Sequence, residues 1–177
     1  MPVILQVERE SDLGPMTADC RSVSVQDAMK RWTTETWMNG SPDEVLELLT
    51  QPDAIASWAP IPFELLSLDG SRLEAGRRAR VRGGLAGRQM EFDVEIREAD
   101  HERLSLVARG PVSIEAEYLV RPARGGSDVA ASVSVCGGGL LGRVMARAVE
   151  ALLAAGALRA SVAGIGRQLE PSLAAAA

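Results

Sequence analysis

Apolar and polar residues alternate through most of the chain between Phe63 and Cys136. The clearest case is the stretch from Arg88 to Arg97, where every second residue from Met90 to Ile96 is apolar and the intervening ones are charged or amide. A period of two is the pattern of a strand with one buried face. With a Thr- and Trp-rich stretch near the start, it predicts seven strands: Arg31–Met38, Phe63–Leu68, Arg77–Arg82, Arg88–Arg97, Leu104–Arg109, Val112–Arg121 and Asp128–Cys136.

The pattern changes to a helical period after Gly137 and keeps it to Glu170, where Pro171 follows. Residues three or four apart share one side of a helix, so this stretch predicts one long helix lying across the concave face of the sheet. Its apolar side is predicted to hold Leu141, Met145, Ala148, Leu152 and Ala155. Its polar stripe is predicted to hold Arg143, Arg147, Glu150, Ala157, Ser161 and Gln168.

Two short helices are expected directly after the first strand. Ser41 can cap a helix, Pro42 fits its first turn, and Glu44 completes a capping box, which predicts a helix over Asp43–Thr50. Gln51-Pro52-Asp53 begins a second helix that ends near Trp58.

The hairpin around Gly83–Gly87 has two alternative registers. A two-residue turn places Ala79 and Val81 on the inner face with Met90 and Phe92, whereas an odd loop drives Arg78, Arg80 and Arg82 inside. Because burying unpaired cations is costly, we expect the two-residue turn. Between the last two strands, Pro122–Ser127 is expected to be a loop.

Composition excludes several functional classes. The chain has 177 residues, enough for one domain, and its net charge of −5 argues against a nucleic-acid footprint. Cys20 and Cys136 are too few for a disulfide framework or a metal cluster, and no cofactor is predicted. No apolar run reaches the length of a transmembrane segment, so we expect a cytoplasmic protein.

The expected organisation is an N-terminal extension over residues 1–30, one domain over residues 31–170 and a disordered tail over residues 171–177. Within the extension, Val3–Glu8 could form an edge strand. The single histidine, His101, lies in a charged turn and is expected to be a solvated loop residue rather than a catalytic base, which argues against a catalytic triad.

The order of these elements resembles the helix-grip fold. The chain is similar to the polyketide cyclase/dehydrase and lipid-transport family of the START-related superfamily over Trp32 to Glu170, in the segments S-P-D-E-V-L-E-L-L-T-Q-P-D, L-E-A-G-R-R-A-R-V, E-A-D-H-E-R-L and G-G-S-D-V. The resemblance implies an α+β fold: a curved antiparallel sheet of about seven strands, two short helices and one long C-terminal helix. It also implies a hydrophobic cavity for lipid-like or polyketide-like molecules.

The sequence is compatible with such a cavity, because few aromatic residues are available to fill one and the long helix offers Ala148, Ala151, Ala154, Ala155 and Gly156. The same small residues could instead let helix and sheet pack closely. The alternative function is a non-enzymatic accessory or membrane-recruiting protein, like the one that accompanies carbon monoxide dehydrogenase systems, which the chain also distantly resembles. A homodimer is left open.

Six residues form the predicted ligand-binding set: Tyr118, Arg88, Met90, Phe92, Trp58 and Phe63. Tyr118 is on an inward position, so its hydroxyl needs either a protein partner or a ligand. Arg88 is two residues before Met90 and therefore lies on the same face of the predicted strand, where it could meet a ligand anion or extend to solvent. Trp58 and Phe63 are expected to form one wall, as core or as ligand contacts. No catalytic residue is assigned, because a cyclase can act largely by positioning its substrate.

Overall fold

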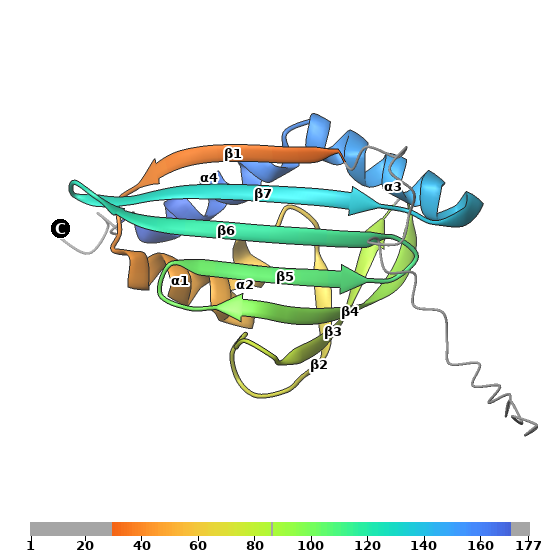
Figure 1. Cartoon of the computed structure of the whole chain (residues 1–177), viewed down its shortest axis with the longest axis horizontal. Coiled ribbons are helices and arrows are strands. Elements are labelled where there is room, and N and C mark those ends of the chain that lie inside the picture. Colours follow the sequence, from red (N-terminus) through yellow and green to blue (C-terminus); the bar gives the residue numbers. More distant parts are fainter. Residues whose placement is uncertain (1–29, 86, 171–177) are drawn as a thin grey trace, which may run out of the picture.

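The computed structural model describes residues 30–85 and 87–170. Its architecture is one curved antiparallel sheet of seven strands in the order β1-β7-β6-β5-β4-β3-β2, with helices packed on one face (Figure 1). The strands are β1 (Arg31–Met38), β2 (Phe63–Leu68), β3 (Arg78–Leu85), β4 (Arg88–Ala99), β5 (Arg103–Arg109), β6 (Ser113–Ala123) and β7 (Gly126–Cys136). The helices are α1 (Pro42–Thr50), α2 (Pro52–Trp58), α3 (Gly139–Ala154) and α4 (Ala157–Leu169). This confirms the predicted fold class.

Helix α1 begins at the predicted capping box. The Ser41 hydroxyl accepts a hydrogen bond from the Glu44 backbone N–H, and the Glu44 carboxylate accepts one of 2.7 Å from the Ser41 backbone N–H. The latter bond lowers the pKa of Glu44, since it favours the charged carboxylate. Local chemistry therefore fixes where the first helix starts.

The β3–β4 hairpin has the predicted register. Leu85 pairs with Arg88, so the turn has two residues, and Val81 pairs with Phe92 on the inner face. The β6–β7 connection differs from the prediction, because Pro122 pairs with Ser127 and both belong to the sheet. The expected loop is reduced to a two-residue turn, in which Gly125 has a φ of +76° that favours glycine.

The predicted single C-terminal helix is wrong in one respect. It is broken between α3 and α4, which meet at an angle of 54°. At the break, Gly156 has a φ of +96°, a left-handed conformation that an α-helix cannot contain. The continuous polar stripe is lost with it: Ser161 is buried and donates its hydroxyl to the Ala157 carbonyl oxygen.

Helix α3 also packs through a different face from the predicted one. Met145 is buried, but Leu141 is 58% exposed, and Ala155 and Leu152 also lie at the surface. The packed face consists instead of Gly142, Met145, Ala146 and Val149. The reason is close approach: a Cβ on Gly142 would lie 2.9 Å from the Pro111 carbonyl oxygen. Only small residues fit there, so the leucines face outward.

The predicted N-terminal extension, with its edge strand Val3–Glu8, and the predicted C-terminal tail lie outside the described residues. Within the described ranges, no single helix is long and apolar enough to cross a membrane. The pair α3 and α4 reaches that length and composition only when the two helices are taken together across their bend. The cellular compartment stays a prediction.

Candidate ligand-binding face

The sheet separates charge from apolar surface. Its outer face carries cross-strand ion pairs such as Arg80–Asp93 at 3.0 Å and Arg82–Glu91 at 2.7 Å. On the inner face of β2–β6, Arg88 and Tyr118 are the only polar side chains among the described strand residues, since the register turns the others outward. The inner face is therefore suited to apolar groups.

The helices leave part of this face uncovered. Helix α4 packs on β1 and β7, α1 packs on β5, β6 and β7, and α3 packs on β7 and reaches β3 at one end, so the part of the inner face formed by β2–β4 is less covered. Leu65 is on the inner face of β2, opposite Val81, and is 39% exposed. A Cβ added to Gly83, between Phe63 and Met90, would meet nothing within 4 Å. This uncovered part of the face, formed by Phe63, Leu65, Val81, Gly83 and Met90, is called the open inner face below.

Tyr118 lies at the other, covered end of the inner face. It is 8% exposed, and its ring meets the Trp58 ring edge to face, with centroids 6.3 Å apart. Trp58 is held in place because its indole N–H donates to the Leu48 carbonyl oxygen at 3.1 Å. The side of α4 approaches closely here, since a Cβ on Gly164 would lie 3.0 Å from the Trp58 Cβ.

The Tyr118 hydroxyl has no hydrogen-bond partner among residues 30–85 and 87–170. No fully buried side-chain oxygen in those ranges is without a partner, so this hydroxyl keeps some accessible surface. Burial raises the pKa of Tyr118 to about 12, because the charged phenolate would be poorly solvated. At neutral pH the group is therefore a hydrogen-bond donor and acceptor, not a base.

Five of the six predicted residues fall into two groups rather than one. Tyr118 and Trp58 are in contact, and Phe63 and Met90 flank Gly83 beside Phe92. The two groups are far apart along the sheet. Tyr118 pairs with Leu104, whereas Phe92 contacts Gly110, six residues further along; at about 3.3 Å per residue this is about 20 Å.

Arg88 belongs to neither group. It is exposed at the end of the β3–β4 hairpin. Both alternatives for this side chain, contact with a ligand anion and extension to solvent, stay predictions. The sequence also missed Leu65 and Gly83 as members of the open inner face. The alternation of Phe63 and Leu65 was the available signal for the first of them.

One sequence argument for a cavity does not hold. Ala151, Ala154 and Ala155 are exposed and do not face the sheet, so they line no space between helix and sheet. The cavity itself stays a prediction, supported by the open inner face and no longer by these alanines.

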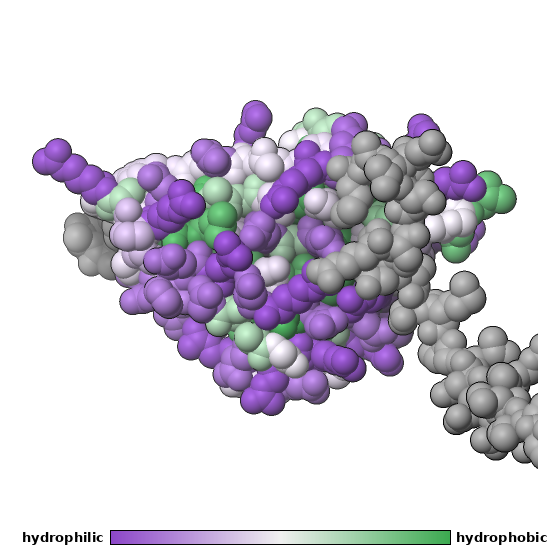
Figure 2. All heavy atoms as spheres, in the orientation of Figure 1, coloured by the Kyte–Doolittle hydropathy of each residue, from purple (hydrophilic) through white to green (hydrophobic). Residues whose placement is uncertain are grey.

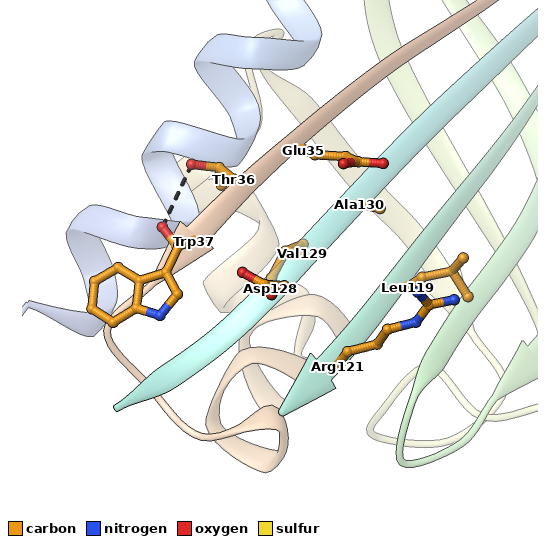
Figure 3. A pocket seen from close by; sticks show the side chains of 8 residues that line it. All are labelled: Glu35, Thr36, Trp37, Leu119, Arg121, Asp128, Val129 and Ala130. Carbon is orange, nitrogen blue, oxygen red and sulfur yellow. Dashed lines mark hydrogen bonds between the residues drawn. The ribbon is translucent and has the colours of Figure 1, made fainter. Parts of the chain in front are cut away.

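Hollows also occur on the outer face. One of about 450 Å³ lies over β1, β7 and β6, where Figure 3 shows Glu35, Arg121 and Asp128 around Leu119 and Ala130, with Trp37 beside them. In Figure 2 the same region shows apolar side chains surrounded by hydrophilic ones. It is wide and shallow with charged walls, unlike the site expected for a hydrophobic molecule.

The turn containing His101 is structural. Asp100 accepts hydrogen bonds from the backbone N–H groups of Glu102 at 2.9 Å and Arg103 at 2.8 Å, which lowers the pKa of Asp100. His101 is exposed beside it, as predicted. Across the part of the chain that the structure describes, no three His, Cys, Asp or Glu side chains are grouped so that they could hold a metal ion.

Fold and inner face together define a helix-grip protein with an apolar concave surface. Residues 29–170 match the model of the family described as "Polyketide cyclase / dehydrase and lipid transport", and the chain belongs to this family. Comparison with curated proteins found no match.

Several solved structures are similar in fold. Protein CV1439 from Chromobacterium violaceum has a TM-score of 0.61 at 16% identity, covering 80% of this chain and 97% of its own. Protein jhp0584 from Helicobacter pylori has a TM-score of 0.60 at 14% identity, covering 96% and 99%. DynU16, a protein of the dynemicin biosynthetic locus, has a TM-score of 0.55 at 21% identity, covering 79% of this chain and 47% of its own.

Proposed function

We propose that the protein binds an uncharged, largely apolar small molecule, lipid-like or polyketide-like, against the open inner face. The observation that carries the proposal is the partial exposure of Leu65 and the free space at Gly83, on a surface that β2–β4 otherwise fill with apolar residues. Family membership supports a hydrophobic ligand. A ligand there would gain about 25 cal/mol for each Å² of apolar surface removed from water.

The charge distribution limits the ligand's chemistry. A carboxylate or phosphate bound among Phe63, Leu65 and Met90 would lose its hydration without gaining a partner, which is costly. Arg88, at the end of the hairpin, is the one inner-face cation of the described strands and would accept only an anionic group that stays near the rim. The ligand body is therefore uncharged.

Tyr118 sets a second condition. Its hydroxyl is unpartnered within the described ranges and remains protonated at neutral pH, so it suits one carbonyl or hydroxyl oxygen of a ligand. A molecule that touches both Tyr118 and the open inner face must be about 20 Å long, given their separation along the strands. Catalysis of the cyclase type would here rest on positioning, with Tyr118 donating to a carbonyl oxygen.

Titration with Nile red, an uncharged fluorescent probe that carries one carbonyl, tests the site. We expect Leu65→Gln and Met90→Gln to weaken binding about 10-fold each, because a polar amide replaces an apolar contact. Tyr118→Phe should leave Nile red binding on the open inner face unchanged, because Tyr118 lies about 20 Å away along the strands and the probe is shorter than that. Native mass spectrometry after gentle purification should show a co-purified species.

Trp37→Gln is the matched control, since Trp37 lies beside the outer-face hollow of Figure 3. Loss of Nile red binding in Trp37→Gln, with none in Leu65→Gln or Met90→Gln, would place the probe on the outer face and contradict the proposal. The alternative accessory function is not tested by any structural observation and stays a prediction.

A further inference from the structure

Helix α3 carries most of the exposed large apolar side chains in the described part of the chain. Six large apolar side chains are exposed in residues 30–85 and 87–170, and four of them, Leu140, Leu141, Val144 and Leu152, are on this one helix. Leu140 is 81% exposed and Val144 is 58% exposed. Figure 1 shows the start of α3 projecting past the ends of the strands, and Figure 2 shows apolar side chains at that projecting end. Contiguous apolar exposure of this kind marks an interaction surface.

These residues form a second apolar face on α3, separate from the packed one. At about 100° per residue, Leu140, Leu141, Val144 and Leu152 fall within an arc of about 120°, whose centre is about 130° from that of the face that meets the sheet. Arg143 and Arg147 lie along one border of this arc. We call the four apolar residues with these two arginines the α3 outer face. An apolar arc bordered by arginines is the pattern of a helix that lies in a membrane interface.

The charge of the helical pair differs from that of the rest of the chain. Between Gly139 and Leu169 there are four arginines and one acidic residue, although the whole chain has a net charge of −5. Arg143 donates to the Gly139 carbonyl oxygen, and no described carboxylate pairs with it or with Arg147. Many arginines of the sheet, by contrast, are in ion pairs, such as Arg103 with Glu98. The α3 outer face is therefore complementary to an anionic surface.

We propose that the α3 outer face docks on an anionic lipid surface. Leu140, Leu141 and Val144 enter the boundary between headgroups and acyl chains, while Arg143 and Arg147 extend to the lipid phosphates. A second copy of the chain is a poorer occupant. A twofold contact through this face would bring two arginines from each copy close together, with one carboxylate per copy, Glu150, on that side of α3. The proposal does not depend on the ligand site.

Vesicle flotation with the full chain tests this surface. We expect binding to vesicles of equimolar phosphatidylcholine and phosphatidylglycerol, and much weaker binding to phosphatidylcholine alone. Leu141→Gln and Val144→Gln should each weaken binding about 10-fold, through lost apolar burial. Arg143→Gln and Arg147→Gln should each weaken it about 5-fold, with the loss shrinking at high salt.

Two matched controls are available. Trp37→Gln removes a comparably exposed apolar residue from β1, and Arg124→Gln removes an exposed arginine from the β6–β7 turn; both should bind vesicles like the unaltered chain. Equal binding to both kinds of vesicle, no binding to either, or equal losses in the controls would overturn the proposal. A fall in molecular mass on light scattering of Leu141→Gln, without vesicle binding, would also overturn it and assign the face to a second copy.

Discussion

The orientation of α3 on the sheet makes a sharp stability prediction. The hydrophobic pattern places Leu141 and Met145 on the same packed face, whereas in the structure Met145 is 5% exposed and Leu141 is 58% exposed. Met145→Ala should therefore lower the free energy of unfolding by about 3 kcal/mol, because it removes buried atoms and leaves a cavity. Leu141→Ala should cost only about 0.5 kcal/mol, since most of that side chain is already in water.

Urea unfolding followed by tryptophan fluorescence measures both values. Trp58 packs against Tyr118 in the core and reports on the folded state. The two variants should differ by about 2 kcal/mol or more, with equal slopes of unfolding free energy against urea, which would show that the unfolded states are comparable. Equal losses in the two variants would mean that α3 packs by its leucines. No loss in either would mean that α3 is not docked on the sheet at all.

Three further predictions follow from the described contacts. Gly142→Ala should destabilise the fold by about 1–2 kcal/mol, because its Cβ would meet the Pro111 carbonyl oxygen. Gly166→Ala in α4, with open space at its Cβ, should stabilise the fold by about 0.5–1 kcal/mol. The same sign in both variants would refute the close approach of α3 to Pro111. Ser41→Ala should cost about 1 kcal/mol in the same unfolding assay through loss of the α1 cap, and an unchanged midpoint would count against that cap. Because the pKa of Tyr118 is raised in the folded state, this residue should contribute about 2–3 kcal/mol to the free energy of unfolding below pH 10.0, and that contribution should be lost as the pH rises to about 12. The near-ultraviolet absorbance of this single tyrosine measures its titration. Titration at the ordinary pKa would show that the ring is solvated.

Local signals predicted most of the fold. The capping residues Ser41 and Glu44 and the alternation in β4 act within a few residues, so sequence alone places α1 and the inner side of β4. The break at Gly156 was missed because an isolated glycine is tolerated in a helical pattern, and only its positive φ reveals the end of α3. The packed face of α3 was missed because the pattern ranks residues by hydropathy. In the structure α3 lies so close to Pro111 that small size, not hydropathy, decides which residues face the sheet.

The candidate site was also predictable in part, because the alternation along a strand shows which residues share its inner face. Strand parity places Tyr118, Met90 and Phe92 on the inner face, and the structure has all three there. Parity contains no information on how far apart such residues lie along the sheet, which depends on the pairing of strands β4, β5 and β6. It also cannot show which half of the face the helices cover. Both follow from long-range contacts, so the two groups of site residues appeared only in the structure.

The position of α3 connects the two proposed surfaces. Gly142 against Pro111 holds the helix close to the end of the sheet, where it contacts β7 and β3. Docked there, α3 points its leucines away from the protein and does not extend over Leu65, which stays partly exposed on β2. If α3 instead turned its leucines inward, the helix would stand further from the sheet by the size of those side chains, and the α3 outer face would be buried. A substitution that enlarges residue 142 therefore disturbs lipid docking directly, whereas Nile red binding on the open inner face changes only if α3 moves over β2–β4.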